Sequence, residues 1–112
     1  MIVGIGVDIV DVKRFAEITI TPKFIDKYFS KNEASLSAQS LAGRFAAREA
    51  FYKALQNQEL FDWKDIEVVS EIGGKPKFIF YNALADFCST KKIFLTITHV
   101  PEFAISVVVI ED

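Results

Sequence analysis

The chain has 112 residues and a formal charge of −2, with 51% apolar and 25% charged side chains. This composition predicts one globular domain over residues 1–112 and excludes a disordered or fibrous chain. The charge argues against a general nucleic-acid binder, a single cysteine and a single histidine exclude a zinc cage, and no apolar run is long enough for a membrane helix. Because the first residues lack a basic secretory leader, we expect a cytoplasmic protein.

The first part of the chain predicts one strand and two short helices. Residues 2–10 are rich in β-branched side chains and contain two glycines, which is typical of a buried strand. Asp11 is placed to cap a helix that ends near Ile18, and Thr21 is placed to cap a second helix that ends near Phe29. The proline after Thr21 supports the second start, because proline is favoured in the first turn of a helix.

The longest helical pattern covers residues 40–55. Large apolar side chains recur there at helical spacing, and five alanines favour both the helix and close packing. Before it, Ser30 and Glu33 have the spacing of a capping box, which predicts another helix start.

The second half of the chain reads mainly as strands. Residues 66–72 and 77–81 flank a glycine-rich turn, residues 82–90 follow as a helix capped by its first residue, and residues 93–98 and 103–110 predict an antiparallel pair. Helices therefore cluster early and strands late. This order predicts an α+β fold, with an antiparallel sheet packed against a long central helix and shorter helices.

Asp8 stands in a run of valine, isoleucine and glycine, where an unpaired carboxylate is costly to bury. Such a residue either reaches solvent at the exit of the strand or is held in its charged form by a cation. From this residue alone, a solvated aspartate is the expected case and a functional role is the alternative.

Four charged residues share the long helix, namely Arg44, Arg48, Glu49 and Lys53. Glu49 and Lys53 are four positions apart with the acid first, which is the orientation of an ordinary helical salt bridge. Arg44 and Arg48 are also four apart, so they repel each other slightly unless an anion bridges them. By themselves these residues predict a solvated helix face rather than a site.

Two further candidates are the pair Thr98 and His99, at the end of an apolar strand, and the turn at residues 73–76. A lone histidine at a strand end is more often a structural residue than a catalyst, and most Gly-Gly-Lys-Pro segments are only turns. The chain has neither the spacing of a P-loop nor the glycine pattern of a Rossmann fold.

Residues 12–31 form a basic segment on an otherwise acidic chain. The segment has five basic and two acidic side chains, a local charge of +3. Such a face suggests a docking surface for an anionic partner, and a solvated helix face is the simpler alternative. The basic side chains are Lys13, Arg14, Lys23, Lys27 and Lys31.

The order of these features along the chain points to one family. The features are Gly4–Ile9 around Asp8, the pair Lys13-Arg14, the helix segment Gly43–Ala54, the turn Gly74–Pro76 and the pair Thr98-His99. Together they closely resemble the holo-acyl-carrier-protein synthases, the short phosphopantetheinyl transferases, over essentially the whole chain. The combination of a strand aspartate with the helix Arg-Phe-Ala-Ala-x-Glu-Ala-x-x-Lys is specific to that family.

The resemblance implies an enzyme that transfers 4′-phosphopantetheine from coenzyme A to a serine of apo acyl carrier protein, in fatty acid biosynthesis, and releases adenosine 3′,5′-bisphosphate. Asp8 matches the family's metal aspartate and Glu49 its metal glutamate, which implies one Mg²⁺ held by both carboxylates. A bound cation would also explain why an aspartate stands in an apolar strand.

Other residues match the family's donor site. Lys53 matches a lysine that neutralises charge on the transferred phosphoryl group, and Arg44 matches a basic residue near the coenzyme A phosphates. The remaining matches are Thr98 and His99, which line the nucleotide site, and Gly74, Lys75 and Pro76, whose turn holds the adenosine end.

The implied reaction is an in-line attack of the serine oxygen on the β-phosphorus. Glu49, directly or through a water on the metal, is the first choice for the group that takes the serine proton, and His99 is the alternative. The catalytic candidates are therefore Asp8, Glu49, Lys53 and His99.

The resemblance also implies partners. Arg14 matches a helix arginine that docks the acidic carrier protein, which gives a purpose to the neighbouring Lys13, Lys23 and Lys27. The family is expected to form a homotrimer with active sites at subunit interfaces, where Asp8 and the helix of Glu49 come from different faces of the pairings.

Two positions depart from the family pattern. Arg48 stands where the family usually has lysine, which keeps the charge but changes the geometry of any anion contact. Gln56 stands where the family often has glycine, so the loop before Phe61 is expected to take a different path.

Two other functions fit part of the pattern. A docking module without activity would keep the basic segment, but it has no need of Asp8, Glu49 and Lys53 together. A Mg²⁺-dependent hydrolase of small pyrophosphates would use the same three residues and would release adenosine 3′,5′-bisphosphate without any carrier protein.

Overall fold

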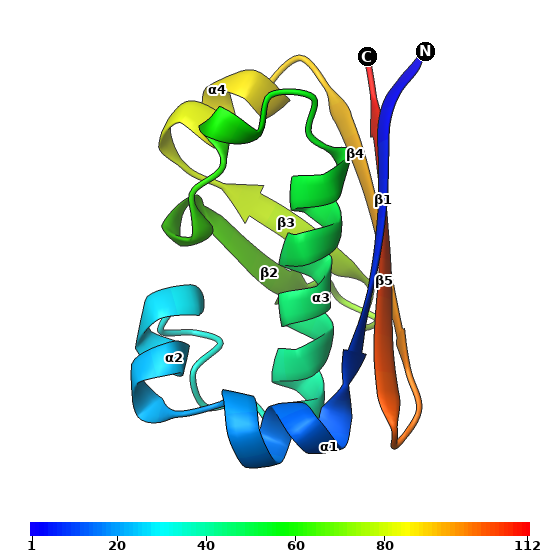
Figure 1. Ribbon diagram of the computed structural model, residues 1–112. Coiled ribbons are helices and arrows are strands. Elements are labelled where there is room, and N and C mark those ends of the chain that lie inside the picture. Colours follow the sequence, from blue (N-terminus) through cyan, green and yellow to red (C-terminus); the bar gives the residue numbers. More distant parts are fainter.

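The computed structural model describes residues 1–112, in which one long helix lies across a three-stranded sheet (Figure 1). A two-stranded sheet and the shorter helices lie on the other side of that helix, with α1 and α2 near one end and α4 near the other (Figure 1). The elements in chain order are β1 (Ile2–Asp11), α1 (Val12–Arg14), the π-helical turn η1 (Phe15–Thr19), α2 (Pro22–Tyr28), α3 (Ala38–Ala54), the 3-10 turns η2 (Gln58–Leu60) and η3 (Trp63–Asp65), β2 (Ile66–Ser70), β3 (Pro76–Phe80), α4 (Asn82–Cys88), β4 (Lys92–His99) and β5 (Phe103–Glu111).

The larger sheet has the strand order β1-β5-β4, and both pairings are antiparallel. Strands β2 and β3 form a separate antiparallel hairpin. The α+β prediction is therefore confirmed, and the five strands are divided between two sheets.

Helix α3 packs directly on β1. A Cβ at Gly4 would overlap the carbonyl oxygen of Ala54, and a Cβ at Gly6 would overlap that of Ala50. Since successive side chains of a strand alternate between its faces, the next residue on this inner face is Asp8. The two glycines thus let the helix approach closely and bring Asp8 beside it.

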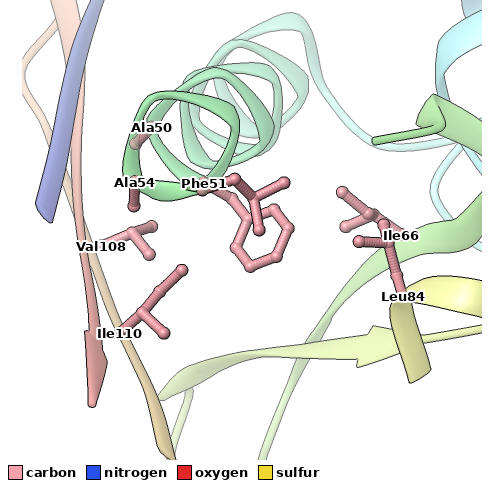
Figure 2. Close-up of a cluster of buried hydrophobic side chains, with 8 residues drawn as sticks. Ala50, Phe51, Ala54, Ile66, Leu84, Val108 and Ile110 are labelled. Atoms are coloured by element: carbon pink, nitrogen blue, oxygen red, sulfur yellow. The ribbon is translucent and has the colours of Figure 1, made fainter. Parts of the chain in front are cut away.

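The main hydrophobic cluster lies between the two sheets and is centred on Phe51 (Figure 2). Ala50 and Ala54 of α3 meet inward side chains of β5, while Phe51 is directed toward β2 and α4 (Figure 2). The buried members are Ala50, Phe51, Ala54, Leu55, Ile66, Leu84, Val108 and Ile110.

The expectation that the first strand is buried is wrong for one of its faces. Ile5, Val7 and Ile9 are exposed, because β1 is an edge strand and nothing in the chain covers the outer side of the sheet. Phe94 of β4 is exposed as well.

The two predicted caps at the start of the chain are confirmed. The side chain of Asp11 accepts a hydrogen bond from the backbone N–H of Arg14 at 2.9 Å, and that of Thr21 accepts one from Phe24 at 3.1 Å. Each helix is short, and η1 continues the first one as a π-helical turn.

Two predicted helix starts are wrong. The Glu33 side chain does accept from the Ser30 N–H at 3.1 Å, but residues 31–36 form turns, because the same carboxylate is held by an arginine of α3. Asn82 does not cap α4; it lies inside the first turn at φ 56°, and its side chain donates to Asp65 at 2.8 Å.

No helix is both long and apolar enough to cross a membrane.

Candidate active site

Asp8 and Lys53 form an ion pair between β1 and α3. The Lys53 Nζ lies 3.0 Å from Oδ1 of Asp8 and also donates to the carbonyl oxygen of Val7 at 3.0 Å. The Asp8 side chain is only 17% exposed. Of the two expectations for Asp8, the structure therefore shows the one in which a cation holds the carboxylate, and that cation is Lys53.

Glu49 lies beside this pair and does not form the predicted helical salt bridge with Lys53. Burial raises the pKa of the Glu49 carboxyl above its usual value, and the nearby charge of Asp8 raises it further. Only Lys53 opposes these effects, and it does so in part. Two carboxylates thus share one ammonium group and leave an excess of negative charge.

This pair of carboxylates fits a divalent cation. Mg²⁺ prefers oxygen ligands and usually takes few of them from protein, which suits two carboxylates. A cation here would also relieve the charge excess that raises the Glu49 pKa. No cluster of three or more histidine, cysteine, aspartate or glutamate side chains forms a metal site elsewhere in the chain.

Glu49 also lines an open groove of about 310 Å³. The other walls are Tyr52, Gln58, Phe61 and Trp63. The aromatic residues of this groove carry no separate signal in the sequence, because their spacing is the same as that of core residues. Phe61 and Trp63 follow Gln56 in the segment after α3, where the sequence departs from the family pattern, and Gln56 is itself exposed.

Arg44 and His99 meet at a second cavity, of about 160 Å³. Gly74 and Pro76 of the β2–β3 turn also line it, as the grouping of these residues predicts. The remaining walls are Ser40, Gly43, Val68, Ser70 and Ile97.

Besides Lys53, which lies with Asp8, two predicted members of the donor site do not line this cavity. Thr98 pairs with Ile105 and is exposed, and strand alternation directs it to the face of the sheet opposite His99. Lys75 is exposed at the hairpin and does not line the cavity either.

The two groups lie on opposite edges of the larger sheet. Asp8 is on β1 and His99 is on β4, with β5 between these strands and α3 across them. Arg44 and Glu49 are five positions apart in α3, about 140° around the helix axis. Asp8 and the helix of Glu49 therefore meet within one chain, so the expectation that they come from different faces of the subunit pairings is wrong. The cavity of Arg44 and His99 lies at the other edge of the sheet.

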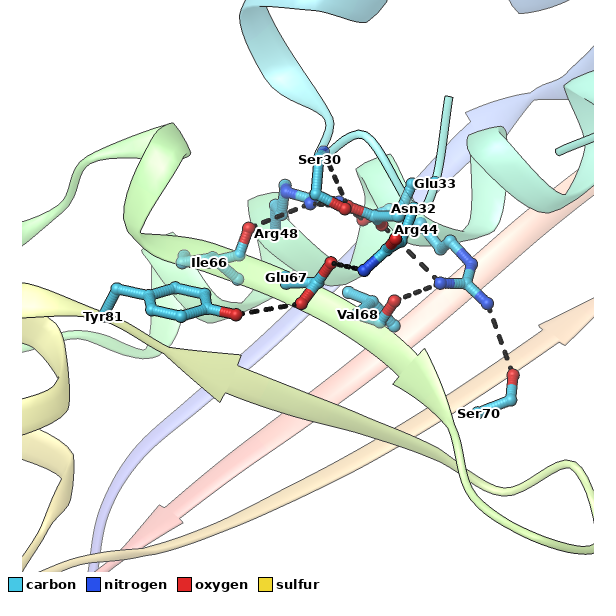
Figure 3. A network of polar contacts seen from close by, with 10 residues as sticks. All are labelled: Ser30, Asn32, Glu33, Arg44, Arg48, Ile66, Glu67, Val68, Ser70 and Tyr81. Atoms are coloured by element: carbon cyan, nitrogen blue, oxygen red, sulfur yellow. Dashed lines mark hydrogen bonds and ion pairs between the residues drawn. The ribbon is translucent and has the colours of Figure 1, made fainter. Parts of the chain in front are cut away.

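A buried polar network connects α3 to β2 and to the loop after α2 (Figure 3). Arg48 is fully buried, so the expectation of a solvated arginine face is wrong for this residue. Its guanidinium binds the buried Glu33 with both terminal nitrogens, at 3.1 Å for Nη1 and in a short contact for Nη2. This contact could not be predicted from sequence spacing, since the two residues are 15 positions apart.

The basic residues predicted to bind a partner lie together at one end of the molecule. They are carried by α1 and α2, at the lower left of Figure 1, and all are exposed. These residues are Lys13, Arg14, Lys23 and Lys27.

Cys88, the single cysteine, is half-buried. Burial raises the pKa of its thiol to about 11, which argues against a reactive thiol.

Known proteins similar to this chain were found by sequence and by structure. The sequence model of the 4′-phosphopantetheinyl transferase superfamily matches residues 4–108. The holo-[acyl-carrier-protein] synthase of Clavibacter michiganensis is 42% identical over 115 residues, which cover 99% of this chain and 97% of that protein.

Two solved structures share the fold over nearly their whole length. A holo-(acyl-carrier-protein) synthase of Bacillus anthracis, solved in complex with CoA (3′,5′-ADP), has a TM-score of 0.81 at 34% identity and covers 99% of this chain and 97% of its own. The holo-[acyl-carrier-protein] synthase of Helicobacter pylori, in complex with coenzyme A, has a TM-score of 0.83 at 29% identity. The match covers 96% of this chain and 99% of that protein.

Proposed function

The chain belongs to the 4′-phosphopantetheinyl transferase superfamily, and on that basis we propose that it is a holo-[acyl-carrier-protein] synthase. It transfers 4′-phosphopantetheine from coenzyme A to a serine of an apo acyl carrier protein. Residues 1–112 act as one transferase domain, in the cytoplasm, on carriers of fatty acid biosynthesis. The observation that carries this proposal is the meeting of Asp8, Glu49 and Lys53 from two distant segments.

Asp8 and Glu49 would hold one Mg²⁺, which supplies positive charge to the pyrophosphate when it is bound. The Lys53 ammonium group contacts Asp8, acts on the charge of Glu49, and adds positive charge for the phosphoryl oxygens. A docking module has no use for this combination of residues.

The transfer forms a bond between the serine oxygen and the β-phosphorus of the donor. The bond from that phosphorus to the bridging oxygen breaks, and adenosine 3′,5′-bisphosphate leaves with the electron pair. The serine gives up its proton in this step. Glu49 is our first choice to accept it, because Glu49 lines an open groove beside Lys53, while His99 lines the cavity on the other edge of the sheet.

We propose that each complete site needs two copies of the chain. One copy provides the carboxylates and Lys53, and its neighbour provides the cavity of Arg44 and His99 for the nucleotide end. The exposed apolar face of the larger sheet supports this assembly, since a surface of this kind is typical of an interface. A homotrimer satisfies the arrangement with three equivalent sites. That face includes Ile5, Val7, Ile9 and Phe94.

The basic segment docks the carrier protein. Arg14 and Lys13 at the end of α1 and Lys23 and Lys27 on α2 are exposed and lie on adjoining elements. Acyl carrier protein is acidic, so complementary charge would guide its approach and would weaken with added salt.

Intact-mass spectrometry of an apo carrier protein tests the proposal. With coenzyme A and Mg²⁺, the carrier should gain one 4′-phosphopantetheinyl group, and a chelator should stop the gain. A carrier with its acceptor serine replaced by alanine is the control. No gain in any apo carrier tested would contradict the proposal, and release of adenosine 3′,5′-bisphosphate without a carrier would indicate a hydrolase instead.

A further inference from the structure

Glu33 lies between two arginines that would otherwise repel each other. Arg44 and Arg48 are one turn apart on α3, and both approach the Glu33 carboxylate (Figure 3). Oε2 of Glu33 lies 3.1 Å from Nη1 of Arg48 and 3.7 Å from Nη1 of Arg44. The anion that bridges this arginine pair therefore comes from the chain itself.

The two arginines have different surroundings. Arg48 is fully buried, and its terminal nitrogens also donate to the carbonyl oxygens of Ile66, at 3.0 Å, and Arg44, at 3.3 Å, while its Nε has no partner. The Arg44 side chain is 15% exposed and lines the cavity shared with His99. The two arginines and Glu33 together carry a net charge of +1. The Glu67 carboxylate interacts with the buried Arg48, so the charge that faces the cavity is that of Arg44.

Arg44 is held in place from three directions. Its Nη1 donates to the carbonyl oxygen of Val68 and lies near Glu33, while its Nη2 donates to Oγ of Ser70 at 3.3 Å. Only one of these partners is charged. A guanidinium group has five N–H donors in a fixed plane, so donors that these partners do not use are available to a ligand phosphate.

We propose that Glu33 is a positioning residue for the donor nucleotide: it fixes the guanidinium of Arg44 at the cavity wall in the orientation that binds a phosphate of coenzyme A. This inference rests on the proposed function. Glu33 does not touch the ligand; it acts through Arg44, and it is itself fixed by Arg48 and by the N–H of Ser30.

The sign of the effect separates positioning from simple electrostatics. Glu33→Gln raises the local charge from +1 to about +2, which by charge alone would strengthen the binding of an anion. If Glu33 instead holds Arg44 in place, the same substitution should weaken the binding of an anion. The paired change Glu33→Leu with Arg48→Met removes both partners of the buried ion pair together, so the charge of these three residues stays at +1. Glu67 loses the nearby Arg48 charge but keeps its hydrogen bonds from Tyr81 and Asn32.

The experiment measures the binding of adenosine 3′,5′-bisphosphate by titration calorimetry and the turnover of coenzyme A with apo carrier. We expect both Glu33→Gln and the paired variant to weaken nucleotide binding and raise KM for coenzyme A by about tenfold, with kcat changed by less than about twofold. Adding Arg44→Met to the paired variant should cause no further loss, because Glu33 acts through Arg44.

Glu67→Gln is the matched control. It also removes a buried carboxylate near Arg48, on the neighbouring strand, but Glu67 accepts hydrogen bonds from Tyr81 and Asn32 and makes no contact with Arg44. Its nucleotide affinity should not fall.

Three results would overturn the inference. They are unchanged or tighter nucleotide binding by a folded variant, a further tenfold loss on adding Arg44→Met, and a paired variant that cannot fold, since Glu33 would then be mainly a folding residue. Wild-type protein that fails to modify any carrier would instead contradict the proposed function. The two failures are therefore distinguishable.

Discussion

Lys53 shows how strongly the role of a single residue depends on which neighbour it meets. Its position suggests a salt bridge with Glu49, one helical turn earlier, yet its ammonium group contacts Asp8, 45 positions away. Glu49 is left partly buried beside a second carboxylate without a hydrogen bond to offset its charge. This unfavourable arrangement in the ion-free chain is what makes the pair suited to a cation.

We expect Glu49→Gln to raise the thermal midpoint of the ion-free protein at neutral pH and to abolish carrier modification. The Glu49 pKa is higher in the folded chain than in the unfolded one, so the native state loses stability as pH rises from the ordinary glutamate pKa through the raised value. Glutamine removes this loss. Differential scanning calorimetry over a pH series measures it.

Added Mg²⁺ should raise the midpoint of the wild type, since a ligand that binds only the folded state stabilises it. Neither Glu49→Gln nor Asp8→Asn should respond to Mg²⁺. Glu59→Gln, at an exposed position on η2, is the control and should behave as the wild type. A normal Mg²⁺ response and near-normal turnover in both site variants would contradict the assignment of these ligands.

At the level of elements, the contact between β1 and α3 places the carboxylates together. The strand follows the helix closely only because Gly4 and Gly6 have no side chain to separate the two backbones. Asp8 continues the same face of the strand, so the spacing that packs the core also sets the distance from Asp8 to the helix. Packing and the proposed metal site thus depend on one interface.

Gly6→Ala should lower the free energy of unfolding by about 3 kcal/mol and should lower Mg²⁺ affinity in whatever protein remains folded. The added Cβ would overlap the backbone oxygen of Ala50, which cannot move without displacing the helix. Urea unfolding measures the first effect, and a Mg²⁺ titration of the thermal midpoint measures the second.

Gly73→Ala is the matched control at the β2–β3 turn. No atom lies within 4 Å of an added Cβ there, so only its positive φ of 94° carries a cost, about 1 to 2 kcal/mol. Equal destabilisation by the two changes, with Mg²⁺ affinity unaffected in both, would show that the approach of strand to helix does not set the site.

At the scale of the whole molecule, the two groups of candidate residues face different directions. The carboxylates lie at the β1 edge of the larger sheet and the cavity proposed for the nucleotide at the β4 edge, with an uncovered apolar surface on the outer side of the same sheet. An assembly that covers this surface can bring the edge of one copy to the opposite edge of another.

Mixing two impaired variants, each defective in a different half of the site, tests this arrangement. Asp8→Asn disables one half of the site and Arg44→Met the other, so an equal mixture that assembles at random should regain about one quarter of wild-type turnover at low coenzyme A concentration. Co-expression followed by the intact-mass assay measures the recovery. Asp8→Asn mixed with Glu49→Gln should recover nothing, because both residues belong to the same half. No recovery in either mixture would contradict the shared site.

The sequence determined the features that depend on local order. The caps at Asp11 and Thr21, the long helix, the two hairpins and the α+β order follow from residue types and spacing over a few positions. The residues that resemble a known family could be named for the same reason, since their order along the chain is itself the signal.

Only the tertiary structure decided which charges meet. Ser30 and Glu33 predict a helix start, but Glu33 binds Arg48 instead. Lys53 forms its ion pair with Asp8 rather than with Glu49. Thr98 and His99 point to opposite faces of their strand, because successive side chains alternate. Such pairings depend on burial and on contacts between distant segments, where the cost of an unpaired charge selects the partner. No spacing along a sequence encodes that selection.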